Sequence, residues 1–99
     1  TFGPVAPVIR VKDADEAVRV ANATDYGLQA GVLAGDVHEA LRVAARLRVG
    51  GVMLMGGPGF DSPHLPFGGV KKSGLGREGI RYAMQEMTVV KTVVLPWPA

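Results

Sequence analysis

The sequence predicts an α/β fold with a mainly parallel sheet and flanking helices, in the order β-α-β-α-β-loop-α-β. Short apolar segments of strand length alternate with segments whose apolar residues recur at helical spacing, a pattern typical of βαβ units. The first three apolar segments are almost free of polar residues, and such strands are usually covered on both faces of the sheet. Ninety-nine residues make one domain at most, and three helices are few for that cover.

The first strand and the first helix are predicted from a proline and an acidic pair. Residues 5–11 form an apolar run that contains Pro7, which indicates an edge strand or a strand that begins after this proline. Asp13 and Glu16 have the spacing of a helix-capping pair, and apolar residues follow at helical spacing. We therefore expect the first helix over residues 14–23.

A second strand and a second helix follow in the same way. Residues 28–34 are small and apolar and end before a glycine, as in a buried strand. Asp36 and Glu39 repeat the capping spacing. An apolar stripe that includes Leu47 then predicts a helix that is stopped by Gly50.

The second half of the chain predicts two more strands, a loop and a helix. Residues 52–55 read as a short buried strand, and the glycines and prolines of residues 56–65 exclude regular structure. A loop that follows a parallel strand is where open α/β sheets place their ligand sites. A third helix is expected from about Arg77 to Met87. The β-branched residues from Thr88 to Leu95 predict a last strand.

Ten of the fourteen glycines lie between Gly50 and Gly79, most of them near the glycine segment, residues 66–79. Residues 74–79 spell G-x-G-x-x-G, which suggests a dinucleotide-binding turn. That motif needs a strand directly before it and an acidic residue roughly 20 positions later on a second strand, and neither is predicted here. No glycine directly precedes Lys71 or Lys72, so a phosphate-binding loop is also excluded. The segment instead has the backbone freedom to pass close to another surface.

Composition excludes several classes of function. Eleven basic and nine acidic residues give a net charge of +2 without a run of like charges, so we expect neither nucleic acid nor membrane as a partner. Without cysteine, the chain has no disulfide, no thiolate metal site and no thiol nucleophile, and its two distant histidines predict no metal site. The absence of signal-like and membrane-length apolar segments predicts a cytoplasmic protein. Because the chain begins without an initiator methionine, we expect it to be part of a longer protein.

Several motifs, in order, resemble the carboxy-terminal signatures of the aldehyde dehydrogenase superfamily. They are residues 1–5, residues 21–28, the glycine segment, Met87-Thr88 and Lys91. The resemblance spans essentially the whole chain. It implies that residues 1–87 are the carboxy-terminal part of the catalytic domain and that residues 88–99 are a terminal strand for oligomerisation.

The resemblance also implies an activity, which is the NAD- or NADP-dependent oxidation of an aldehyde to a carboxylic acid. In that family a cysteine thiolate attacks the aldehyde and hydride passes to the nicotinamide. The cysteine and the nucleotide-binding unit lie outside these residues, so we expect the chain alone to be inactive. Its implied partners are the rest of the dehydrogenase chain, a small aldehyde, and a second copy joined through the strand from Thr88 to Leu95. The alternative is a non-catalytic assembly or interaction module derived from that family.

The resemblance assigns site residues by position and assigns no catalytic residue to this chain. Phe2 matches an aromatic beside the nicotinamide ring, with an ordinary core aromatic as the alternative. Phe67 matches a pocket aromatic, and a loop anchor is an equally open interpretation. The loop that shapes the aldehyde entrance in that family supplies the candidate substrate contacts Phe60, Asp61 and His64, each of which can also be a solvated loop residue.

One position departs from the family pattern. Asparagine usually follows the strand that corresponds to residues 52–55, and here the residue is Gly56. The resemblance therefore implies the loss of hydrogen bonds that would steady neighbouring active-site backbone. Charged residues of the glycine segment are expected to fix the loop through ion pairs or hydrogen bonds, namely Lys71, Lys72, Arg77 and Glu78.

Overall fold

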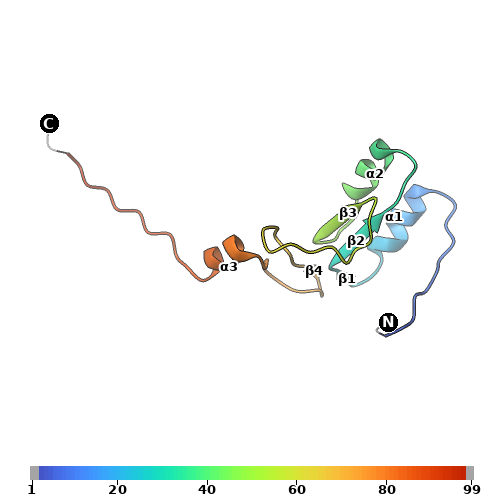
Figure 1. The fold of residues 1–99 in the computed structure, drawn as a ribbon, viewed down its shortest axis with the longest axis horizontal. Coiled ribbons are helices and arrows are strands. Elements are labelled where there is room, and N and C mark those ends of the chain that lie inside the picture. Colours follow the sequence, from blue (N-terminus) through green and yellow to red (C-terminus); the bar gives the residue numbers. More distant parts are fainter. Residues whose placement is uncertain (1–2, 98–99) are drawn as a thin grey trace.

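The computed structural model describes residues 3–97, and within that range the chain forms three helices and four short strands (Figure 1). The α/β fold class is confirmed. The elements in chain order are α1 (Ala14–Asn22), β1 (Tyr26–Gly27), β2 (Gln29–Val32), α2 (Val37–Ala44), β3 (Gly51–Leu54), β4 (Val70–Lys71) and α3 (Ile80–Glu86).

The centre of the molecule is a parallel βαβ unit. β2 pairs with β3 in parallel, from Gln29 opposite Gly51 to Val32 opposite Leu54, and α2 packs on both strands. This pair confirms the parallel arrangement that the apolar runs predict. A second pair, β1 with β4, is antiparallel and joins Tyr26 to Lys71. The sequence pattern did not predict this pair.

The two capping pairs begin α1 and α2 as predicted. The Asp13 carboxylate accepts a hydrogen bond from the backbone N–H of Glu16 at 2.8 Å, and the Asp36 carboxylate accepts one from that of Glu39 at 3.0 Å. These bonds satisfy N–H groups that have no partner within the helix. α1 ends at Asn22, one residue before the predicted end of the helix.

The other two helix boundaries differ from the prediction. α2 ends at Ala44 and does not continue to Leu47, because the side chain of Asn22 binds the backbone of residues 46 and 48 and holds them in a turn. α3 begins at Ile80 and not at Arg77. Glu78 is engaged in a backbone bridge, and Gly79 has a φ of 110°, which is incompatible with a right-handed helix.

The two predicted end strands are not formed in the described part of the chain. Residues 5–11 and 88–95 have no strand partner there, and Val8 and Val90 are 93% and 94% exposed. A strand is stabilised by the ladder of hydrogen bonds to its neighbour, so an apolar β-branched sequence without a neighbour remains extended and unpaired. In Figure 1 residues 88–97 run away from the rest of the molecule beyond α3.

The buried core is small for the length of the chain. Among the described hydrophobic residues only Val18, Val32 and Ala40 are buried, and they come from α1, β2 and α2. The accessible surface is 8308 Å², whereas a self-contained protein of this mass exposes about 5,400 Å². The radius of gyration is 18.9 Å, against about 13 Å for a compact chain of this length. The chain thus exposes about 2,900 Å² beyond what a compact protein of its size exposes.

Candidate functional site

The first half of the glycine segment is docked on the connection between α1 and β1. The Lys71 ammonium donates to the carbonyl oxygens of Asn22 and Thr24, both at 3.0 Å. The Lys72 ammonium lies 2.5 Å from the Asp25 carboxylate. These contacts confirm the loop-fixing role expected of the two lysines. Both cations are therefore engaged within the chain.

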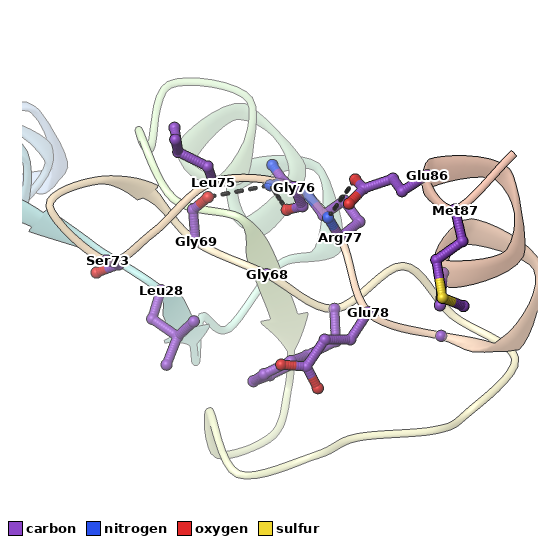
Figure 2. Close-up of a pocket in the computed structure, with 13 residues that line it drawn as sticks. Leu28, Gly68, Gly69, Ser73, Leu75, Gly76, Arg77, Glu78, Glu86 and Met87 are labelled. Atoms are coloured by element: carbon purple, nitrogen blue, oxygen red, sulfur yellow. Dashed lines mark hydrogen bonds between the residues drawn. The ribbon is translucent and has the colours of Figure 1, made fainter. Parts of the chain in front are cut away.

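Arg77 fixes the second half of the glycine segment. Its guanidinium donates to the carbonyl oxygens of Gly69 at 3.0 Å and Gly76 at 2.6 Å, and its backbone N–H donates to the Glu86 carboxylate at 3.1 Å. Figure 2 shows Glu86 reaching from α3 towards Arg77. Gly76 has a φ of 73°, a conformation that glycine adopts without the strain that a side chain would cause. The loop is thus tied both to its own backbone and to α3.

Phe67 is held by its backbone. It forms an isolated antiparallel bridge with Glu78, in which the Glu78 N–H donates to the Phe67 oxygen at 2.6 Å and the Phe67 N–H donates back at 3.1 Å. Glu78 therefore contributes to loop fixing through its main chain. The bridge fixes the backbone position of Phe67, from which the half-buried side chain extends.

Two cavities meet at Phe67. The first, of about 530 Å³, lies under the glycine segment and against α3, where Leu28 and Met87 add apolar surface to the charged groups of Arg77, Glu78 and Glu86 (Figure 2). The second, of about 380 Å³, lies between β2 and the loop of residues 56–65. Its lining consists of Leu28, Gln29, Pro58, Gly59, Phe60, Asp61 and Phe67.

The second cavity, which we call the loop pocket, brings together three of the residues that the sequence assigned to a substrate site. Phe60 and Asp61 come from the loop after β3, and Phe67 comes from the glycine segment. The Gln29 side-chain amide donates to the Phe60 carbonyl at 3.4 Å and links the loop to the start of β2. Phe60 is 56% exposed, so the pocket is an open one.

His64 lies elsewhere, in a groove of about 660 Å³ beside α3 with Ile80 and Arg81. The chain turns between Ser62 and Leu65, and the Ile80 N–H donates to the Pro63 oxygen at 3.1 Å, which directs His64 towards α3. Its assignment as a substrate contact stays a prediction. The assignment of Phe2 to the cofactor falls outside the described residues.

Two residues of the loop pocket lie outside the segments from which the sequence predicted a site. Leu28 contacts both cavities, and Gln29 borders the loop pocket. Gln29 carried a signal, because it is the one polar side chain in the otherwise apolar run of residues 28–34. In the structure its half-buried amide donates to the loop, at the Phe60 oxygen.

The start of the loop is conformationally unusual. Met55, directly after β3, has a φ of 58°, a region that non-glycine residues seldom occupy and that costs of the order of 1–3 kcal/mol. Its N–H is fixed by the Val32 oxygen at 2.8 Å. At Gly56 an added Cβ would have the Leu54 oxygen, at 3.9 Å, as its nearest neighbour. The backbone therefore leaves room for a Cβ at the position where the family pattern places asparagine.

Neither a membrane-spanning helix nor a cluster of metal ligands occurs in the part of the chain that the structure describes. None of the helices in residues 3–97 is both long and apolar enough to span a membrane. Over the same range, histidine and acidic side chains nowhere gather in a group of three that could hold a metal ion.

Comparison with known proteins identifies the relatives of this chain. A lactaldehyde dehydrogenase from Methanococcus maripaludis is 54% identical over 95 residues, which are 96% of this chain and 20% of that protein. The structure of a salicylaldehyde dehydrogenase from Pseudomonas putida G7 matches with a TM-score of 0.86 at 36% identity, over 100% of this chain and 22% of that one. The chain thus spans about a fifth of the length of these relatives.

A further solved relative contains a nucleotide. Glyceraldehyde-3-phosphate dehydrogenase GapN from Methanocaldococcus jannaschii, complexed with NADP, matches with a TM-score of 0.78 at 44% identity, over 83% of this chain and 18% of that one. The sequence matches the aldehyde dehydrogenase family over residues 1–93. A match over nearly the whole chain shows that the chain belongs to the aldehyde dehydrogenase family.

Proposed function

We propose that this chain is the carboxy-terminal part of an NAD(P)-dependent aldehyde dehydrogenase that oxidises an aldehyde to a carboxylic acid. The observation that carries the proposal is the loop pocket, in which Phe60, Asp61 and Phe67 converge from two separate segments. In this proposal residues 1–87 complete the catalytic domain, and residues 88–99 form a strand that joins a second copy.

The role of the chain in the reaction is to bind and enclose the substrate. Phe60 and Phe67 offer aromatic faces to the carbon chain of the aldehyde, and the bridge to Glu78 keeps Phe67 in position. No cysteine occurs in the sequence, so the nucleophile has to come from residues outside it, and the 99 residues alone are inactive in this proposal.

Some groups of the glycine segment that the phosphates of a dinucleotide would need free are already committed to contacts within the chain. Phosphate-binding loops present free backbone N–H groups, whereas those of Lys72, Arg77 and Glu78 already donate to groups within the chain. The lysine ammonium groups are engaged as well. The nucleotide, NAD or NADP, is accordingly bound mainly by residues outside this chain. Phe2 beside the nicotinamide remains part of the proposal through the resemblance alone.

A hybrid enzyme tests the proposal. The matching 95 residues of the M. maripaludis lactaldehyde dehydrogenase are exchanged for those of this chain, and aldehyde-dependent formation of NAD(P)H is measured. We expect the hybrid to keep at least about a tenth of the parent kcat/KM. A tenfold loss corresponds to about 1.4 kcal/mol of transition-state stabilisation. The parent enzyme without the exchanged segment and the 99-residue chain alone serve as inactive controls.

The second candidate function is that of a non-catalytic assembly module. The exposed apolar residues of the terminal segment favour it, since Val89, Val93 and Leu95 are each more than 80% exposed. The same hybrid separates the two candidates. A hybrid that has the circular dichroism spectrum and the mass of its parent, but oxidises no aldehyde, would reject the enzymatic proposal in favour of the module.

The hybrid also allows the anchor between α1 and the turn after α2 to be tested. The Asn22 side chain donates to the Arg46 oxygen at 2.9 Å and accepts from the Arg48 N–H at 2.8 Å, while its carbonyl holds Lys71. Asn22→Ala is expected to lower the free energy of unfolding by about 1–3 kcal/mol, because two backbone groups lose their partner. Thermal unfolding measures the loss. Asn22→Asp keeps the acceptor for the Arg48 N–H, so its unfolding midpoint should lie between those of the unsubstituted hybrid and Asn22→Ala. Equal midpoints for all three proteins would contradict the anchor.

A further inference from the structure

The loop pocket carries one ionisable side chain among the residues that line it. That side chain is Asp61, and the other lining residues are apolar or aromatic, apart from the amide of Gln29. The Gln29 N–H group already donates to the Phe60 oxygen. The polar side-chain groups left for a substrate are the Asp61 carboxylate, which accepts hydrogen bonds, and the oxygen and second N–H of the Gln29 amide, which accept and donate them.

The nearby cations are directed away from this pocket. His64 and Arg81 line the groove beside α3. Lys71 and Lys72 are bound to the α1–β1 connection, and the Arg77 guanidinium is held by two carbonyl oxygens of the glycine segment. None of these five side chains lines the loop pocket. The one charged group that this chain contributes to the wall is therefore the Asp61 carboxylate, which is a hydrogen-bond acceptor.

We propose that Asp61 determines the substrate class of this site, which takes aldehydes that lack a negative charge and carry a hydroxyl or amino donor. Aldehydes with a carboxylate, sulfonate or phosphate group are disfavoured. The inference rests on the proposed function, since it assigns a substrate class to the same pocket. The physical reason is that the exposed Asp61 carboxylate repels an anion that enters the pocket and accepts a hydrogen bond from a neutral donor.

A matched pair of substrates tests the inference in the hybrid enzyme. Glycolaldehyde and sulfoacetaldehyde share a two-carbon skeleton and differ in a hydroxyl or a sulfonate group. The measured quantity is the ratio of their kcat/KM values. We expect a ratio in favour of glycolaldehyde that falls about 3- to 10-fold in Asp61→Asn, mainly through a lower KM for sulfoacetaldehyde, and that falls further in Asp61→Lys.

Two controls isolate the charge at this position. Glu39→Gln removes a carboxylate from α2, outside the loop pocket, and should leave the ratio within about two-fold of the parent hybrid. High salt should reduce the difference between the parent hybrid and Asp61→Asn, because mobile ions screen an exposed charge. Inhibition of glycolaldehyde oxidation by ethanesulfonate gives a second readout, and its inhibition constant should fall in Asp61→Asn and in the smaller variant Asp61→Ser.

The outcomes separate this inference from the proposed function. An active hybrid that prefers sulfoacetaldehyde would overturn the inference and leave the enzymatic proposal intact. The same holds for an active hybrid whose ratio and inhibition constant are unchanged in the Asp61 variants. A correctly assembled hybrid that oxidises neither aldehyde would overturn both.

Discussion

Replacing Gly50 with alanine is expected to displace the glycine segment and to reduce the kcat/KM of the hybrid by more than about 100-fold. An added Cβ at this position would lie 1.6 Å from the Gly68 oxygen and 2.7 Å from the Gly68 carbonyl carbon. Both are backbone atoms, so no side-chain rotation relieves the overlap, and one of the two backbones has to move. A steric conflict of this kind costs upwards of about 3 kcal/mol.

The matched control for this change is Gly35→Ala. A Cβ at Gly35 meets no atom within 4 Å, and its backbone does not have the positive φ that favours glycine. Its free energy of unfolding should therefore change by no more than about 0.5 kcal/mol. Thermal unfolding and aldehyde kinetics of both variants are the measurements. If Gly50→Ala had the stability and kinetics of Gly35→Ala, the close approach of the Gly68 backbone to Gly50 would be contradicted.

Proline at position 90 or 93 is expected to break the hybrid into smaller species. Residues 88–95 are extended, unpaired and apolar in this chain, with Val90 and Val93 more than 80% exposed, which suits them to join the sheet of another copy. The N–H groups of neighbouring strand residues point to opposite sides. Positions 90 and 93 are an odd number of residues apart, so their N–H groups point to opposite sides of the strand. At least one of Val90→Pro and Val93→Pro therefore removes a hydrogen bond to the neighbouring strand.

Light scattering measures the outcome as molecular mass. The loss of a ladder bond and the clash of the proline ring should weaken association by about 3 kcal/mol, or roughly 100-fold. Val90→Thr and Val93→Thr keep the shape and the strand preference of valine and should retain the parent mass. A full-sized assembly in both proline variants would contradict strand pairing through this segment.

The elements that could be predicted from the sequence are those whose cause is local. Asp13 and Asp36 begin their helices by binding N–H groups three residues ahead, and the apolar runs at β2 and β3 predict the parallel pair. The burial predicted for these strands was wrong for this chain, since β3 is half-buried throughout and only Val32 of β2 is buried. The end strands were predicted wrongly for this chain because a strand is defined by its neighbour. The β1–β4 pair was missed because it depends on Lys71 at a φ of 57° and on a contact far away in the sequence.

The site shows the same division between local and distant causes. Resemblance identified Phe60, Asp61 and Phe67, which the structure brings to one pocket. It also suggested His64, which belongs to the same loop but is turned towards α3 by a hydrogen bond between Pro63 and Ile80. That bond joins two backbone groups, which every sequence supplies, so the sequence pattern could not predict it.

The pairing of Tyr26 with Lys71 also determines the order in which the molecule assembles. These residues are 45 positions apart, and closing a loop of that length costs about 3.4 kcal/mol of chain entropy in a simple polymer estimate. The β2–α2–β3 unit closes a loop of about half that length, from Gln29 to Gly51, which costs about 0.6 kcal/mol less, and we expect it to form sooner. We expect the glycine segment to dock late in folding and to open first in the native state, so amide hydrogens of residues 70–73 should exchange before those of β2 and β3. We likewise expect Phe67, which belongs to the glycine segment, to be fixed in position late in folding.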